Sequence, residues 1–309
     1  MPDRMLSCRH ADSLIWLSRL IERAENNARI LEVNFIRPFY GETASWEPLV
    51  AITGNIVDFR RFYDEADAAS VFDFLAFSEA NPNSIVACAD LARENALAVR
   101  ERLPNELFEV VNRLHLTLRA CAHRVGEPVV YPFLDLVKRQ SMIFQGLVEA
   151  ILPHGEDGAF LRIGRYLERL DKTARILDVV HYHADGADEE LWLRVLASVS
   201  AYEAYRRTGG GRVTSRDVTT YLVQDGDFPR SLAFCADQAL RAAQRAFAGV
   251  GEIPQSVRLL EQLDRRLRYS TMEEIEAQGL HAFLQAILQE NNRIGEAIQR
   301  DLFAEEASA

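Results

Sequence analysis

The chain has 309 residues, of which 35 are basic and 46 acidic, so its formal net charge at pH 7 is −11. Hydrophobic residues make up 48% of it, which excludes a disordered or low-complexity chain. The acidic balance argues against a nucleic-acid partner, since duplex binding depends on Lys and Arg neutralising phosphates. No apolar run approaches the roughly 20 residues of a membrane-spanning helix, so no membrane partner is expected either.

The cysteines and the N-terminus both favour a cytoplasmic protein. Four cysteines lie far apart with no CxxC spacing: Cys8, Cys88, Cys121 and Cys235. We expect them to be reduced, buried thiols and not a metal site or a disulfide framework. Residues 1–10 are polar and charged with no apolar segment behind them, so no signal peptide is expected.

Helical periodicity runs along most of the chain. In the first segment, apolar residues recur at steps of three and four, which is typical of one helix face: Leu14, Leu17, Leu20, Ile21, Ala24, Ala28 and Leu31. The same spacing predicts further helices, in chain order, over 46–57, 85–99, 108–122, 133–151, 191–205, 232–247, 257–267 and 280–303. Alternating runs joined by hairpin turns are almost absent. The sequence therefore predicts an all-α fold of ten or more helices packed as bundles.

An internal repeat divides the chain. Residues 16–33 recur as 162–179 at an offset of 146, and residues 82–92 recur as 229–239 at an offset of 147. Two matched blocks in the same order predict a tandem duplication of a helical unit. We expect a first repeat over 1–153 and a second over 154–309, packed as one compact unit with pseudo-two-fold symmetry.

The repeat preserves an Arg-x-x-Glu-Arg motif on the side of the helix opposite the apolar stripe. A merely solvated face requires charge, and not the same residues twice, so the recurrence favours a specific role. One interpretation is a structural network in which Glu22 pairs with Arg169 and Arg23 with Glu168 across the pseudo-axis. The other is a ligand or partner site formed by the charged members of both copies: Arg19, Glu22, Arg23, Arg29, Arg165, Glu168, Arg169 and Arg175.

These segments resemble the alpha-E family, a bacterial all-helical family named for its Glu-Arg motif. The resemblance rests on residues 11–29, 81–85 with 92–95, 164–169, 228–231, 279–283 and 301–303. It therefore covers nearly the whole chain, with residues 208–212 more glycine-rich than is typical. The family is linked to circularly permuted ATP-grasp ligases and to transglutaminase-like proteins. The resemblance thus implies these two partners and a role in making or modifying peptides or other amides.

Catalytic and metal motifs are weak. Di-metal carboxylate bundles use Glu-x-x-His, but 22–25 and 168–171 contain no histidine and their arginine neighbours would compete with a cation. No metal and no cofactor is therefore expected. His181 and His183 point to different helix faces, which indicates helix-end or surface histidines. Residues 208–212 lack Gly-Lys-Ser/Thr, so a flexible connector is expected there, although an anion cradle is the alternative.

Two proline turns predict helix starts. In Asn81-Pro82-Asn83-Ser84, Asn81 is expected to cap the helix and Pro82 to lie in its first turn, and 227–231 repeats the arrangement. The functional alternative is that these two helix N-termini, beside Arg93 or Arg230, bind a carboxylate or phosphate.

Two functional hypotheses remain. The first is a helical accessory or substrate-binding protein that acts with an ATP-grasp-type peptide or amide ligase. The second is an enzyme in its own right, which uses the duplicated Glu-Arg residues for acid–base chemistry on an amide or peptide. The first is favoured because charge repeats are present while no recognised nucleophile or metal set is.

Overall fold

The computed structural model describes residues 7–35, 46–121, 127–182, 188–208, 213–249 and 252–306. Every regular element among them is a helix, which confirms the predicted all-α fold. The first group is α1 (Cys8–Phe35), α2 (Glu47–Ile52), α3 (Ile56–Phe62), α4 (Ala68–Ala76), α5 (Ile85–Ala98), η1 (Arg100–Arg102), α6 (Asn105–Cys121) and α7 (Glu127–Ala150). The second is α8 (Glu156–Asp178), η2 (Val179–Tyr182), α9 (Glu189–Ser198), α10 (Tyr202–Arg207), α11 (Ser215–Gln224), α12 (Leu232–Ala246), α13 (Gln255–Tyr269), α14 (Met272–Gln278) and α15 (Leu280–Glu306). Within the described ranges, no helix is both long and apolar enough to cross a membrane.

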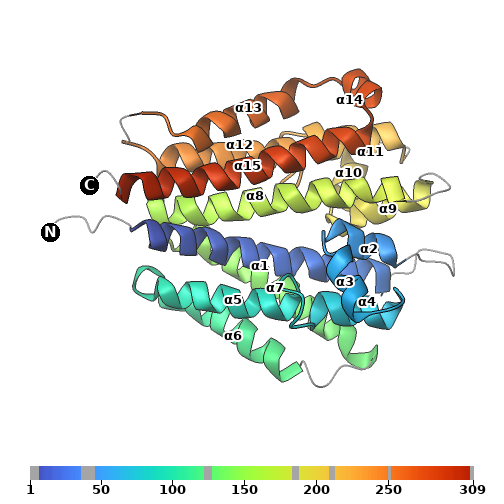
Figure 1. Ribbon diagram of the computed structural model, residues 1–309, viewed down its shortest axis with the longest axis horizontal. Helices are drawn as coiled ribbons and strands as arrows, with labels where there is room; N and C mark the ends of the chain where they lie inside the picture. The colour runs from blue at the N-terminus through green and yellow to red at the C-terminus, as the bar shows by residue number, and fades with distance from the viewer. Residues whose placement is uncertain are drawn as a thin grey trace.

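The helices α1 and α8 form the centre of the molecule. They pack against each other, with α5, α6 and α7 on one side of the pair and α12, α13 and α15 on the other (Figure 1). The two backbones approach closely where Gly164 of α8 faces Ile15 of α1. A Cβ on Gly164 would lie 2.2 Å from the carbonyl oxygen of Ile15, so only glycine fits this crossing.

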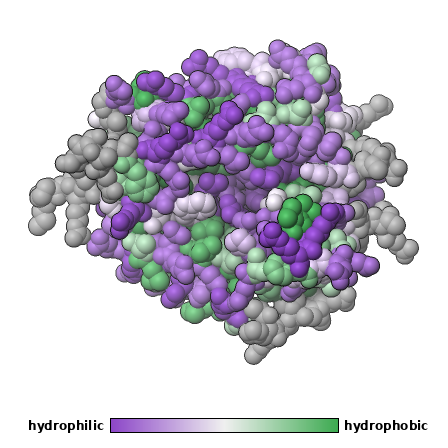
Figure 2. All heavy atoms as spheres, viewed as in Figure 1, coloured by the Kyte–Doolittle hydropathy of each residue, from purple (hydrophilic) through white to green (hydrophobic). Residues whose placement is uncertain are grey.

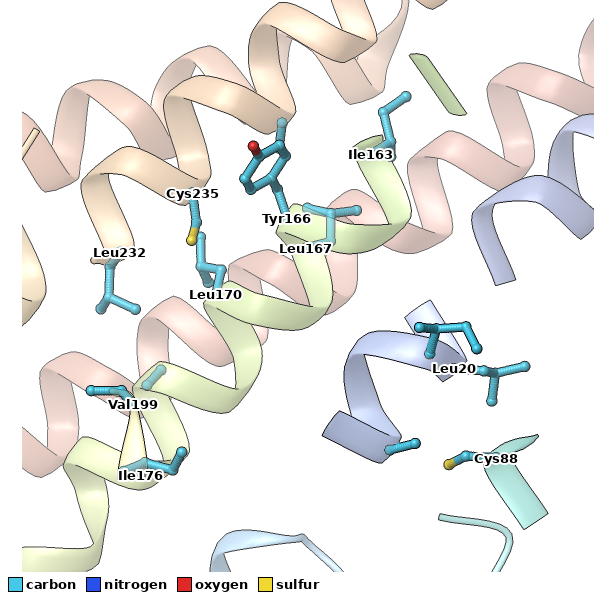
Figure 3. Close-up of a cluster of buried hydrophobic side chains, with 14 of the residues drawn as sticks. Leu20, Cys88, Ile163, Tyr166, Leu167, Leu170, Ile176, Val199, Leu232 and Cys235 are labelled. Carbon is cyan, nitrogen blue, oxygen red and sulfur yellow. The ribbon is translucent and has the colours of Figure 1, made fainter. Parts of the chain in front are cut away.

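The predicted apolar stripe of α1 is buried throughout, as expected: Leu14, Leu17, Leu20, Ile21, Ala24, Ala28 and Leu31. Figure 3 shows Leu20 of α1 beside Cys88 on one side, and Cys235 of α12 beside Leu170 of α8 on the other. Cys8, Cys88 and Cys235 are buried, as predicted, whereas Cys121 is only half-buried. The face drawn in Figure 2 is mainly hydrophilic, and its apolar side chains lie in small separate groups.

Two stretches that were predicted as single helices, 46–57 and 191–205, are each split in two. Gly54 separates α2 from α3 with φ +81°, and Ser200 separates α9 from α10 with φ +54°. A residue in the left-handed region cannot continue a right-handed helix, so each helix ends there. At the second break, the N–H groups of Ser200 and Ala201 bond back to carbonyls in the last turn of α9, which satisfies that helix end.

A helix follows each proline turn, as predicted, but the cap residue and the place of Pro82 are wrong, since Pro82 lies before the cap and not in the first turn of α5. Ser84 caps α5 by accepting from the Ala87 N–H at 3.2 Å, and Ser231 caps α12 by accepting from the Phe234 N–H at 3.0 Å. Asn81 lies one turn earlier and is fully buried. Its side chain donates to the Phe74 carbonyl at 2.9 Å, so it fastens the turn to α4 instead of capping α5.

Candidate site: a buried Glu–Arg cluster

The two Glu-Arg motifs meet as reciprocal ion pairs between α1 and α8. Arg169 donates through Nε and Nη2 to the two carboxylate oxygens of Glu22, at 2.7 and 2.8 Å. Arg23 does the same to Glu168, again at 2.7 and 2.8 Å. Both glutamates are only 1% exposed. The predicted pairing is therefore confirmed, and each pair has the bidentate geometry of the strongest charge-assisted hydrogen bonds.

Around Glu22 the pair is enclosed by further donors. Gln145 of α7 donates to Glu22 at 2.6 Å, and Arg230 donates to it at 3.2 Å. Arg230 also donates to Glu25 at 2.7 Å, and Ser141 of α7 donates to Glu25 at 2.8 Å. Arg230 thus holds two carboxylates of α1 from the turn ahead of α12. It therefore does not serve an anion site at a helix N-terminus.

Around Glu168 the arrangement is different. Arg19 supplies the additional contact, from Nε to Glu168 at 3.2 Å. Arg23 extends its Nη1 to the Asn83 side chain at 2.6 Å. The side chains of Arg19 and Arg23 are 17% and 16% exposed, whereas that of Arg169 is 3% exposed. The Glu168 pair is therefore closer to solvent than the Glu22 pair.

Each copy has an additional acid–arginine pair one turn further along its helix. Arg29 donates to Glu25 at 2.6 Å, and Arg175 donates to Asp171 at 2.8 Å, both with i, i+4 spacing. Lys172 lies beside the second pair and is 4% exposed. Burial is the main influence on Lys172 and lowers the pKa of its ammonium, against the raising effect of Glu168 and Asp171.

The motif residues do not all join one network. Arg19 and Arg23 share Glu168. Separately, Glu22 binds Arg169 and is linked through Arg230 and Glu25 to Arg29. Arg165, which corresponds to Arg19 in the repeat, instead lies 3.4 Å from Glu149 of α7, and its buried Nε has no hydrogen-bond partner. The sequence placed Arg230 beside a helix N-terminus and not in this cluster, because Asn83 occupies its place in the repeat. Ser141 and Gln145 were missed, because α7 carries no copy of the motif.

We use the name Glu–Arg cluster for the acidic side chains in these contacts together with their basic neighbours. Its acids are Glu22, Glu25, Glu168 and Asp171, and its bases are Arg19, Arg23, Arg29, Arg169, Lys172, Arg175 and Arg230. Among the described residues, seven basic side chains thus face four acidic ones. Even with Lys172 neutral, the cluster holds a surplus of two positive charges inside a protein whose net charge is −11.

Two carboxylates of the cluster, those of Glu25 and Glu168, are held ionised. Burial alone raises the pKa of Glu25, but the guanidinium groups of Arg230, Arg29 and Arg169 outweigh it and lower the pKa to about 2. Burial likewise opposes the Arg23 and Arg19 charges at Glu168, and the arginines again prevail and lower its pKa. Carboxyl groups in this state are poorly suited to proton transfer near neutral pH.

The thiols near the cluster are not activated. Burial raises the pKa of Cys88 and of Cys235 to about 12, although Arg23 and Arg169 respectively act in the opposite direction. Both thiols therefore stay protonated at neutral pH and are poor nucleophiles. Among the described residues, no group of three or more His, Cys, Asp or Glu side chains is arranged to hold a metal ion.

Two cavities open at the ends of the cluster. One of about 340 Å³ is lined by Arg19 with residues of α1 and α15. The other, of about 570 Å³, is lined by Arg29 with residues of α7, α9 and α10. In the second, the Arg29 Nη1 donates to the Ser200 hydroxyl at 2.6 Å. Arg19 and Arg29 are therefore the predicted binding residues that reach an open space.

The remaining predicted features play no part in the cluster. His181 is exposed at the end of α8, as predicted, and stacks on His281 with ring centroids 3.7 Å apart. His183 and residues 209–212 lie outside the described residues. Arg93 donates to Asn112 at 2.7 Å, so it does not face the turn that precedes α5.

Comparison with known proteins identifies one family. The profile of Alpha-E, described as a predicted alpha-helical domain with a conserved ER motif, matches residues 5–303. Uncharacterized proteins of Mycobacterium bovis and of two Mycobacterium tuberculosis strains are each 27% identical to the chain, over 91% of its length. The chain spans about 35% of the length of these relatives. No solved structure matches it.

Proposed function

The chain belongs to the Alpha-E family, and we propose that it is a helical accessory protein that binds a substrate for a circularly permuted ATP-grasp-type ligase. The ligase would form peptide or other amide bonds, and a transglutaminase-like protein is the second proposed partner. Both partners are expectations from the family resemblance. A cytoplasmic location is proposed with them, and the buried, unbridged thiols of Cys88 and Cys235 support it.

The observation that carries the proposal is the surplus positive charge of the Glu–Arg cluster. Buried charges are costly unless they are paired, so a purely structural network would be expected to balance its charges. This one does not, since seven basic side chains face four acidic ones in the described part of the chain. At the open ends, Asp12 and Glu296 beside Arg19 and Glu32 and Glu203 beside Arg29 offset part of this surplus. An anionic substrate there would supply further negative charge.

The alternative, an enzyme that uses the Glu-Arg residues for acid–base chemistry, is less well supported. General acid–base catalysis works best with a pKa near the working pH, whereas the pKa values of Glu25 and Glu168 are displaced downward. Burial raises the pKa of the nearby Cys88 and Cys235 thiols, which makes them poor nucleophiles at neutral pH. A binding role requires neither kind of group.

We also propose that the site arose by tandem duplication of a unit ending near residue 153, with the halves related by a pseudo-two-fold axis. Three observations support this origin. The Glu-Arg pairs are reciprocal between α1 and α8. The serine caps of α5 and α12 lie 147 residues apart. The left-handed residues Gly54 and Ser200 lie 146 residues apart, close to Arg175 and Arg29 respectively.

The proposed function is tested by reconstitution with the circularly permuted ATP-grasp protein of the same organism. We expect the two proteins to co-purify and the ligase to consume ATP and form an amide faster when this chain is present. The matched comparison uses Arg29→Gln, in which the charge at the larger cavity is lost, and Arg139→Gln, which removes an exposed arginine of α7. No association, together with an unchanged ligation rate, would refute the proposal.

A further inference from the structure

The cavity beside Arg19 has features that the cluster itself does not explain. It lies between the first turns of α1 and the later turns of α15, at the end of the molecule where both chain termini lie (Figure 1). Its volume is about 340 Å³, in the range of small-molecule sites, which start at roughly 300 Å³. Ile15, Leu167 and Ile298 form an apolar part of its lining, and all three are buried.

Arg19 offers the cavity a fixed cation. Its Nε is bound to Glu168, and its Cζ lies 5.1 Å from the centre of the Trp16 ring. Its Nη1 lies 3.7 Å from the place of a Cβ on Gly295, so the guanidinium rests against α15. Within the described residues, neither Nη atom has a hydrogen-bond partner. Two parallel donors on a guanidinium already held by its Nε and by an aromatic ring form a ready site for a carboxylate.

The same cavity also contains acidic groups. Asp12 lies two turns before Arg19 on α1, and Glu296 lies on α15. Asp12 is half-buried, and burial raises the pKa of its carboxyl against the effects of Gln299, Trp16 and Arg19. Side chains on a helix lean toward its N-terminus, so the Arg19 guanidinium extends past Trp16 in the direction of Asp12. A ligand in the cavity therefore meets a cation and an anion at neighbouring points.

We propose that this cavity binds the backbone of an amino acid or short peptide in its zwitterionic form. The ligand's carboxylate accepts from the two Nη atoms of Arg19, and its ammonium donates to Asp12. The amide side chain of Asn292, which also lines the cavity, is available to a peptide bond between the two charges. The inference rests on the proposed function, because it names the class of substrate that the accessory protein would present for amide formation.

The repeat supplies a matched control. Arg165 corresponds to Arg19 in the sequence, but it contacts Glu149 and lines none of the cavities described here. Both side chains also lie near an aromatic ring, with Arg165 4.9 Å from the centre of Tyr166. Replacing either arginine removes one charge from the same kind of surroundings, so only a ligand site at Arg19 distinguishes the two variants.

The experiment compares three probes on the purified full chain: alanylalanine, N-acetyl-alanylalanine without the amine, and alanylalanine amide without the carboxylate. We expect alanylalanine to bind the parent and Arg165→Gln equally, and each blocked probe to bind about tenfold more weakly or worse. Arg19→Gln should bind alanylalanine about tenfold more weakly and should no longer distinguish it from the amide. Asp12→Asn should no longer distinguish it from the acetylated probe.

Each outcome bears on the proposal separately from the ligase. Equal binding of all three probes to the parent, or undiminished alanylalanine binding in Arg19→Gln, would overturn the zwitterion site. Should Arg19→Gln melt well below the parent, Asp12→Asn and Gln299→Ala decide the matter, since neither touches a cluster carboxylate. If peptide binding fails but the chain still associates with the ligase, the proposed function stands without the zwitterion site. If the chain binds the peptide but does not associate with the ligase, the zwitterion site stands without the proposed function.

Discussion

The two Glu-Arg pairs have the same internal geometry and different surroundings. The Arg169–Glu22 pair is sealed by Gln145 and Arg230, whereas the Arg23–Glu168 pair extends through Arg19 to a cavity. Position 230 is arginine where the first copy has Asn83, and this substitution closes one side. The comparison teaches that one motif can have two surroundings: a sealed pair holds α1 against α8, and an open pair places an arginine at a cavity.

The largest difference between the pairs should appear on removing their carboxylates. Glu22→Gln leaves Arg169 without a counter-charge in an enclosed position and leaves Arg230 with Glu25 alone. Breaking a buried pair costs about 3–5 kcal/mol. Glu168→Gln leaves Arg19 and Arg23, which are 17% and 16% exposed and can be hydrated, so we expect about half that loss. Urea unfolding of both variants measures the two losses. Equal losses would show that the exposure of the arginines has no energetic consequence.

The crossing of α1 and α8 offers a second asymmetry. A Cβ on Gly164 would lie 2.2 Å from the Ile15 carbonyl oxygen, so Gly164→Ala must separate the helices. Overpacking of this kind costs about 1–3 kcal/mol, and we expect the upper end because backbone is the obstacle. Ser18 holds the matching place on α1, and Ser18→Ala should change the free energy of unfolding by less than about 1 kcal/mol. A thermally unperturbed Gly164→Ala would contradict the crossing geometry.

Acid should weaken the ion pairs of Glu25 and of Glu168. The pKa of Glu25 is lowered to about 2 and that of Glu168 is lowered in the same direction, so their stabilising effect is complete above the unfolded-state pKa, roughly 4.3. It is lost as the pH falls below that value toward the folded-state pKa, by up to about 1.4 kcal/mol per pH unit for each group.

Unfolding free energies measured between neutral pH and pH 3 check this slope. Glu25→Gln should have a shallower slope than the parent by about one proton. Identical slopes in the parent and in Glu25→Gln would show that this carboxyl does not hold a lowered pKa.

The smallest expected effects concern the matched helix breaks. A non-glycine residue in the left-handed region costs about 1 kcal/mol, and Ser200 offsets this with its bond to Arg29. Ser200→Ala should therefore be less stable than Ser200→Gly by about 1 kcal/mol. At Gly54, whose Cβ would lie 3.2 Å from the Arg175 Nη1, serine should be tolerated better than alanine. If serine gives a higher melting temperature than alanine at both positions, the result supports the matched breaks. If serine is better at one position and alanine at the other, the result contradicts them.

Much of this arrangement could be predicted from the sequence because periodic and repeated patterns carry it. The spacing of Leu14, Leu17 and Leu20 determines a helix face, and the repeated motif was enough to predict the Glu22–Arg169 pair. The breaks at Gly54 and Ser200 could not be predicted, since a backbone angle at one residue leaves no periodic trace. The contacts of Arg230 and Gln145 with the cluster could not be predicted, because tertiary packing alone brings α7 and the turn before α12 to it.

The central claim is that Arg19 meets a ligand and Arg165 does not. The most direct measurement is an NMR titration of arginine-labelled protein with alanylalanine, following the side-chain Nε–H signals of Arg19 and Arg165 in one sample. We predict that the Arg19 signal shifts in a saturable manner while the Arg165 signal stays in place. Equal shifts of both signals, or none at Arg19 over a range in which the peptide binds, would contradict the claim.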